Sequence, residues 1–188
     1  MSVSRCFTCR FALLPLAVAI SSVAQADESL ELDNVYITGG EDQVLTQPGS
    51  ATLIDDIALE QFEYSDINRV LNAVPGVNLQ EEDGYGLRPN IGLRGTSPER
   101  SKKITLMEDG VLAGPAPYSA PAAYYFPNVS RMSAVEVFKG PATIQYGPAT
   151  IGGAVNLVSR PIPFAASGEL DVQYGSDNFQ RYEAWYGA

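Results

Sequence analysis

The 188-residue sequence predicts an α+β protein in which short helices accompany a small mixed β-sheet and two longer strands follow. Apolar residues from Ile67 to Val74 recur at the i, i+3, i+4, i+7 spacing of a helix with one buried face. Two β-branched runs, 135–138 and 154–158, flank a segment rich in Gly and Pro, which predicts strands joined by tight turns. Apolar and polar residues alternate over 169–174 and 179–186, as they do in strands with two different faces.

Cap and turn residues place the other elements of the predicted domain. Asp55 or Asp56 is expected to cap a short helical turn, and Ser65 to cap a helix that ends at Ala73. The Asp-Gly dipeptide at 109–110 predicts a tight hairpin turn, because both residues tolerate positive φ. The other expected strands are 51–54, 77–80, 103–107 and 111–112.

Composition excludes several classes of function. The chain carries 22 acidic and 12 scattered basic residues, and it lacks the basic cluster that binding to nucleic acid requires. The absence of histidine excludes His-ligated zinc and His-based triads. The segment 147–152 begins like a phosphate-binding loop, but Gly153 stands in place of the lysine of that motif. We therefore expect no enzyme, no metal site and no cofactor.

Residues 1–26 have the pattern of a secretory signal peptide. Arg5 and Arg10 give the start of the segment a positive charge, and an apolar run follows from residue 11 to residue 20. Ala24-Gln25-Ala26 is an A-x-A cleavage site. We expect cleavage after Ala26. The C-x-x-C pair at 6–9 lies in the segment that is removed, so the mature chain would contain no cysteine.

Two later segments have compositions that suggest interaction surfaces. Polar flanks surround a short β-prone run at 35–38, which is either an N-terminal strand of the domain's own sheet or a strand donated to another protein. The segment 113–127 contains four prolines, three tyrosines and one phenylalanine with almost no charge. Because ordinary loops are more polar, this segment is expected to be buried under other structure or to face a ligand.

Five motifs occur in the order and approximate spacing of one protein family. They are Leu93-Arg94-Gly95, Met107-Glu108-Asp109-Gly110, residues 135–140, Tyr146-Gly147 and residues 152–156. Together they resemble the plug domain of TonB-dependent outer-membrane receptors. Ala116-Pro117-Tyr118 and the run 156–163 are similar to the ferric citrate receptor branch of that family.

The resemblance implies a domain organisation. A segment at 27–48 would follow the signal peptide, the plug domain would occupy 49–163, and 164–188 would form the first strands of a transmembrane β-barrel. Two strands cannot close a barrel, because the smallest barrels have about eight. We therefore expect the chain to be an N-terminal fragment of a receptor with an incomplete barrel.

The resemblance also implies the residues that act. The TonB box would consist of Asp33, Asn34, Val35, Tyr36, Ile37, Thr38 and Gly39, and it would pair with periplasmic TonB. The ligand-facing residues would be Arg94, Tyr118, Tyr124 and Tyr125. Arg94 has an alternative role in an ion pair between plug and barrel. Ala120 stands where the ferric citrate branch has a glutamine that helps to hold the ligand.

The function implied by the resemblance is energised import across the outer membrane of a Gram-negative bacterium. The ligand would be a ferric siderophore or a chelate similar to ferric citrate, and the partners would be TonB and outer-membrane lipid. Two alternatives stay open: a receptor for cobalamin, haem or an oligosaccharide, and an isolated periplasmic module that binds a ligand by itself.

Overall fold

The computed structural model describes residues 36, 44, 46, 48–61, 63–113 and 125–188. They divide into two compact units, one within Asp33–Pro161 and a second that includes Ile162–Ala188. The signal peptide with its cleavage site at Ala26 lies outside the described residues, as does the TonB box apart from Tyr36. Most of the aromatic segment 113–127, including Tyr118 and Tyr124, also lies outside them.

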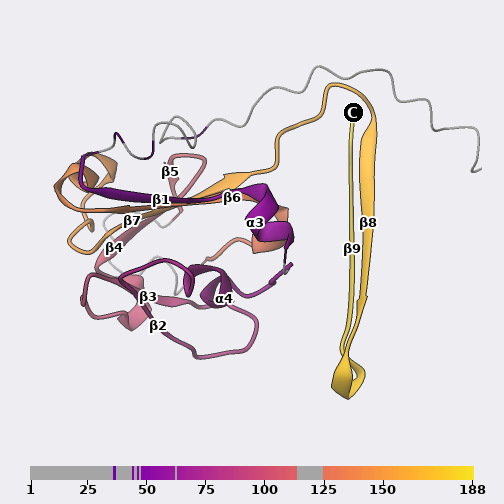
Figure 1. Cartoon of the computed structure of the whole chain (residues 1–188), viewed down its shortest axis with the longest axis horizontal. Helices are drawn as coiled ribbons and strands as arrows, with labels where there is room; N and C mark the ends of the chain where they lie inside the picture. Colours follow the sequence, from indigo (N-terminus) through magenta and orange to yellow (C-terminus); the bar gives the residue numbers. More distant parts are fainter. Residues whose placement is uncertain (1–35, 37–43, 45, 47, 62, 114–124) are drawn as a thin grey trace, which may run out of the picture. The chain divides into compact units, whose positions relative to one another are not determined.

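The first unit is built on a five-stranded sheet with the order β1-β6-β7-β4-β5 (Figure 1). The strands are β1 (Ser50–Ile54), β4 (Ile104–Glu108), β5 (Val111–Leu112), β6 (Met132–Lys139) and β7 (Gly153–Ser159). Strands β4 and β7 pair in parallel, and the other neighbours pair antiparallel. The predicted α+β class with a small mixed sheet is therefore confirmed.

The two β-branched runs form neighbouring strands of this sheet. β6 and β7 pair from Met132 with Ser159 to Phe138 with Ala154. The connection between them contains a short 3₁₀ helix, Pro141–Tyr146, bounded by Gly140 and Gly147 at φ of 118° and 142°. The predicted Asp-Gly hairpin joins β4 to β5, with φ of 50° and 77° at its two turn residues.

Two short helices and a second sheet complete the first unit. Helix α3 (Asp56–Glu60) is capped by Asp55, whose side chain accepts the N–H of Ala58 at 2.8 Å. Helix α4 (Ile67–Leu71) is capped by Asp66. The expected cap, Ser65, is wrong by one residue, because the Asp66 carboxylate accepts the N–H of Asn68 at 2.8 Å. Strands β2 (Val77–Gln80) and β3 (Asn90–Leu93) form a separate antiparallel pair.

The two faces of the main sheet are packed differently. One face contacts α4 and β3 in a continuous apolar core that includes Ile67, Leu71, Ile91, Leu93, Leu106, Val135, Val137, Val155 and Leu157. The other face holds a smaller apolar cluster of Met107, Phe138 and Ala154, with Tyr146 packed against it. Glu136 and Asn156 are both fully buried and bond to one another at 2.8 Å. The carboxylate of Glu136, on β6, is therefore buried inside the protein.

The second unit contains a long hairpin of β8 (Ser167–Tyr174) and β9 (Gln180–Gly187), drawn in yellow in Figure 1. Val172 pairs with Tyr182 and Leu170 with Ala184, so the apolar residues of both strands share one face. Asp171 pairs with Glu183 on the other face. The predicted alternation is therefore confirmed. No helix among the described residues is long and apolar enough to cross a membrane.

We predict that Gly153→Ala destabilises the chain by about 2–4 kcal/mol. Gly153 has φ of 151°, and a methyl group there would lie 2.3 Å from the carbonyl oxygen of Phe138, which is backbone and cannot move aside. Gly84→Ala is the matched control, because nothing lies within 4 Å of the added methyl group. Urea unfolding followed by circular dichroism measures both changes. An equal loss of stability in the two variants would contradict the assignment of Gly153 as a packing glycine.

Candidate functional site

Arg94 lies in a tight turn immediately after β3. Its φ is 53°, and its backbone N–H donates to the carbonyl of Gly76 at 2.8 Å. The side chain is exposed, and its guanidinium lies beside Gly140, where an added methyl group would be 3.4 Å from Nη1. The turn therefore directs a fixed positive charge toward the end of β6.

Lys139, the last residue of β6, places a second positive charge next to Arg94. Lys139 is only 5% exposed, and its Nζ donates to the carbonyl of Pro75 at 2.8 Å. Burial, followed by repulsion from Arg94, lowers the pKa of Lys139 below its ordinary value. Among the described residues, neither cation has a carboxylate within ion-pair distance. The pair can therefore accept a carboxylate from a ligand or from another protein segment.

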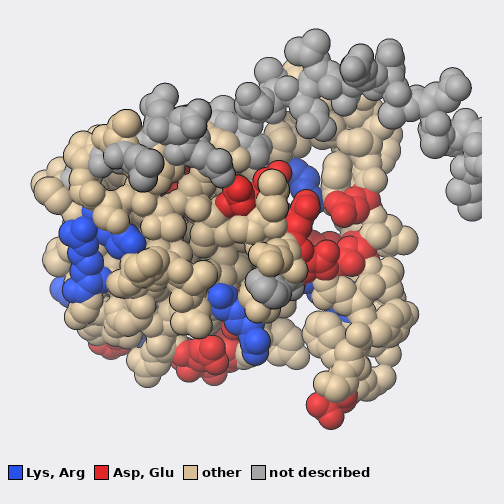
Figure 2. Space-filling model, viewed as in Figure 1, with Lys and Arg blue, Asp and Glu red and all other residues tan. Residues whose placement is uncertain are grey.

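On the face shown in Figure 2, the charged groups do not merge into one basic area. Figure 2 shows the Lys and Arg side chains in small separate groups, with acidic groups between and beside them. This distribution matches the scattered basic residues of the sequence. A local cationic pair can recognise one anionic group, whereas binding along a nucleic acid requires a continuous basic surface.

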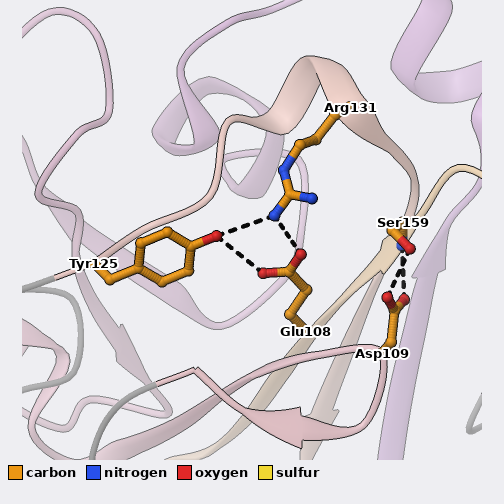
Figure 3. A network of polar contacts seen from close by, with 5 residues as sticks. All are labelled: Glu108, Asp109, Tyr125, Arg131 and Ser159. Atoms are coloured by element: carbon orange, nitrogen blue, oxygen red, sulfur yellow. Dashed lines mark hydrogen bonds and ion pairs between the residues drawn. The ribbon is translucent and has the colours of Figure 1, made fainter. Parts of the chain in front are cut away.

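Tyr125, a predicted ligand-facing residue, belongs to a polar network at the far end of β4 (Figure 3). Its hydroxyl donates to Glu108 Oε2 at 3.2 Å and accepts from Arg131 Nη2 at 3.0 Å. Arg131 also pairs with Glu108. Partial burial opposes the charge of Arg131, but the hydrogen bond and charge of Glu108 outweigh it and raise the pKa of Arg131. The hydroxyl of Tyr125 is thus occupied by contacts within the protein.

A second set of contacts fixes the turn that follows Glu108. Asp109 accepts the N–H of Ser159 at 2.8 Å and its hydroxyl at 2.6 Å. Asn156 Oδ1 accepts the N–H of Gly110 at 2.9 Å, while Asn156 Nδ2 donates to Glu136. Sequence reasoning found the turn but missed these partners, because Asp109 and Ser159 are 50 positions apart.

The acidic segment between β2 and β3 forms a defined turn in which one carboxylate has a structural role. Asp83 accepts backbone N–H groups from Tyr85 at 2.8 Å and Leu87 at 3.2 Å. Burial opposes the charged form, but several backbone N–H groups together lower the pKa of Asp83. Among the described residues there is no cluster of Cys, Asp and Glu able to hold a metal ion.

The sequence also matches a known family over most of this region. A sequence model of the TonB-dependent Receptor Plug Domain matches residues 43–154, which is more than half of the 188 residues. The chain belongs to the TonB-dependent receptor plug family. The matched range contains strands β1, β4, β5 and β6, the first two residues of β7, Arg94, Lys139 and the Glu108 network.

Solved receptors have the same fold over most of the chain. The ferric citrate transporter FecA in its unliganded form is 30% identical, with a TM-score of 0.60 over 73% of this chain and 22% of that one. The siderophore receptor PirA from Acinetobacter baumannii is 25% identical, with a TM-score of 0.51 over 72% and 20%. The G324V mutant of the ferric enterobactin receptor PfeA from Pseudomonas aeruginosa is 23% identical, with a TM-score of 0.51 over 70% of this chain and 20% of that one. At this identity the likeness supports the fold alone. The chain thus spans about a fifth of the length of these receptors.

We predict that the contribution of Lys139 to stability rises with pH in the alkaline range. Its folded-state pKa lies below the ordinary 10.5, so between these two values Lys139 binds more protons in the unfolded chain than in the folded chain. This contribution therefore increases as pH rises through this window. Lys139→Met should flatten the rise, and Arg94→Gln should reduce it by removing the repulsive charge. Urea unfolding at a series of pH values measures the slope, and an unchanged slope in Lys139→Met would contradict the assignment.

Proposed function

We propose that this chain forms the plug, and the start of the barrel, of a TonB-dependent outer-membrane receptor that imports a ferric chelate. The observation that carries the proposal is the family match, together with 30% identity to FecA over 73% of the chain. The ligand would be a ferric siderophore or a chelate similar to ferric citrate. The receptor would act in the outer membrane of a Gram-negative bacterium, and it would have no enzymatic activity.

The proposed domain organisation follows the same likeness. Residues 1–26 direct export, 27–48 carry the TonB box, 49–163 form the plug, and 164–188 begin the barrel. The hairpin β8–β9 supports this assignment, because its apolar face carries Leu170, Val172 and Tyr182 and these side chains are exposed. Such a face suits contact with outer-membrane lipid, and its polar face suits a barrel interior.

The proposed TonB box at 33–39 transmits force by β-strand pairing. Backbone pairing needs little side-chain specificity and draws on main-chain hydrogen bonds, so it suits a short segment that is pulled by a partner. Only Tyr36 of this segment lies within the described residues. The assignment therefore depends on the likeness of 33–39 to the box and on its place between the signal peptide and the plug.

Arg94 has two proposed roles, and each role gives it a different anionic partner. As a ligand-facing residue, Arg94 attracts an anionic chelate beside Lys139, at the end of β6 opposite to the one where Tyr125 contacts Arg131. As a structural residue, Arg94 pairs with a carboxylate of the barrel. The adjacent Lys139 favours the second role, because Lys139 is only 5% exposed. A bulky chelate reaches a buried ammonium less easily than a carboxylate side chain does. A ligand other than a siderophore or ferric citrate, such as cobalamin, haem or an oligosaccharide, is the alternative cargo.

We predict that Ile37→Pro in the full-length gene product abolishes import while leaving ligand binding intact. Proline removes a backbone N–H from the box and so breaks strand pairing with TonB. Uptake of radiolabelled ferric citrate by cells measures import, and binding to isolated outer membranes measures affinity. Ile37→Val, which keeps the N–H, is the control and should import normally. Normal import by Ile37→Pro would exclude the box mechanism.

We predict that Arg94→Gln separates the two roles of the arginine. Loss of a ligand contact would weaken ferric citrate binding roughly tenfold or more, as expected for one charge-assisted hydrogen bond. Loss of a plug–barrel ion pair would leave affinity unchanged and lower the unfolding temperature of the full-length protein. If Arg94→Gln altered neither affinity nor unfolding temperature, Arg94 would have neither role.

A further inference from the structure

Arg94 is the first central residue of a tight turn that spans residues 93–96. The N–H of Thr96 donates to the carbonyl of Leu93 at 3.1 Å, and φ is 53° at Arg94 and 78° at Gly95. Positive φ at both central positions is the pattern of a type I′ turn, which favours Gly, Asn and Asp. Arginine keeps such a conformation only where surrounding contacts hold it there. The turn therefore depends on contacts that fix an unfavourable backbone beneath an exposed cation.

The hydroxyl of Thr96 supplies two of these contacts. It accepts the N–H of Leu93 at 3.1 Å and donates to the carbonyl of Leu93 at 2.9 Å. Leu93 is fully buried at the end of β3, so the hydroxyl fastens the turn to the apolar core. A methyl group on Gly152 would lie 2.7 Å from the same hydroxyl oxygen. The hydroxyl thus occupies space that a side chain at position 152 would take.

The neighbouring segment 76–78 holds the turn from a second side. The N–H of Arg94 donates to the carbonyl of Gly76 at 2.8 Å, one step beyond the pairing of Val77 with Leu93 in the β2–β3 sheet. The side chain of Asn78 donates through Nδ2 to the carbonyl of Thr96 at 3.2 Å. The hydroxyl of Thr96 is therefore the side-chain group that closes the turn from within, and the segment 76–78 supports it from outside.

The position of the guanidinium follows from the turn. A methyl group on Gly140 would lie 3.4 Å from Arg94 Nη1 and 3.7 Å from Nη2, so the guanidinium lies against the backbone of a glycine. Lys139 precedes that glycine, and its Nζ is held by the carbonyl of Pro75 at 2.8 Å. Two cations bind one anion best when both are already in place, because no ordering is then required on binding. A change in the turn would move Arg94 relative to Lys139.

We propose that Thr96 is a positioning residue for Arg94. Its hydroxyl fixes the turn that directs the guanidinium toward Lys139, and it acts through Arg94 rather than on the anion. The proposal rests on the proposed function, because it takes Arg94 as a group that binds an anion, either the chelate or a carboxylate of the barrel. It holds for both of these anions, since the turn sets the direction of the arginine in either case.

Variants at position 96 of the full-length gene product test the proposal. Thr96→Val removes the hydroxyl and keeps the shape of the side chain, whereas Thr96→Ser keeps the hydroxyl. Each variant is made with Arg94 intact and with Arg94→Gln. Ser133→Ala is the matched control, because it removes a buried hydroxyl that donates to two carbonyls at the end of β7, away from the turn. Hydrogen exchange followed by mass spectrometry reports on the amides of 93–96, radiolabelled ferric citrate measures affinity, and thermal unfolding measures stability.

The expected result is faster amide exchange across 93–96 in Thr96→Val, with unchanged exchange there in Thr96→Ser and Ser133→Ala. If Arg94 contacts the ligand, ferric citrate affinity should fall about fivefold in Thr96→Val, as for one hydrogen bond, and recover in Thr96→Ser. In the Arg94→Gln background, Thr96→Val should cause no further loss of affinity. If Arg94 pairs with a carboxylate of the barrel, Thr96→Val should lower the unfolding temperature, and by less when Arg94 is already replaced.

The comparison between the two backgrounds separates positioning from a merely structural role. A loss in Thr96→Val that is equally large with Arg94→Gln would overturn the proposal, because Thr96 would then stabilise the fold without acting through the arginine. Unchanged amide exchange in Thr96→Val would also overturn it, as would an equal loss in Thr96→Ser, which keeps the hydroxyl.

The two proposals fail in different ways. If the unaltered protein does not bind ferric citrate, the cargo named under the proposed function is wrong, and amide exchange together with unfolding temperature still decides whether Thr96 positions Arg94. If Arg94→Gln impairs binding or stability and Thr96→Val impairs neither, the positioning role is overturned while the receptor function stands.

Discussion

The hydrogen bond between Glu136 and Asn156 holds together the most deeply buried part of the plug. Both side chains are fully buried, on adjacent strands of the sheet. A buried carboxylate is costly unless it is bonded, and Asn156 supplies one of the bonds of Glu136. The same amide accepts the N–H of Gly110 through its oxygen. One asparagine thus connects the centre of the sheet to the Asp-Gly turn that follows Glu108.

The fold separates two charged sites along the sheet. At one end of β6, Arg94 and Lys139 form a cationic pair without a carboxylate partner among the described residues. At the other end, Arg131 is already paired with Glu108. An unpaired cationic site is suited to receive an anion from outside the unit, whereas a paired site is suited to hold neighbouring chain segments in place. The proposed receptor function gives each site a role without requiring any catalytic chemistry.

Local patterns in the sequence were sufficient for most of the elements, although β3 was not predicted, and insufficient for their arrangement. Asp109-Gly110, the cap at Asp55 and the alternation in β8 and β9 depend on residues close in sequence, and the structure confirms them. The cap of α4 lies at Asp66 rather than Ser65, since neighbouring acceptors compete for the same N–H groups. The parallel pairing of β4 with β7 joins residues almost 50 positions apart, and no local pattern encodes it.

The candidate site was predictable only in part for the same reason. Arg94 could be predicted as a site residue because it lies in a family motif. Its neighbour Lys139 could not, because the two residues come together only through the packing of β3 and β6 in the fold. Tyr125 was expected to face a ligand, and the contacts of its hydroxyl with Glu108 and Arg131 required the structure. Glu136 could not be identified as buried from its sequence, because an acidic residue in a strand is ordinarily placed on the exposed face.

In the proposed function, residues 33–39 couple this plug to TonB. The most direct test is calorimetric titration of the purified periplasmic domain of TonB into the full-length gene product, with 33–39 either intact or replaced by a Gly-Ser sequence of equal length. The account predicts saturable one-to-one binding to the intact protein and loss of that binding after replacement. Equal binding to both proteins, or binding to neither, would contradict it.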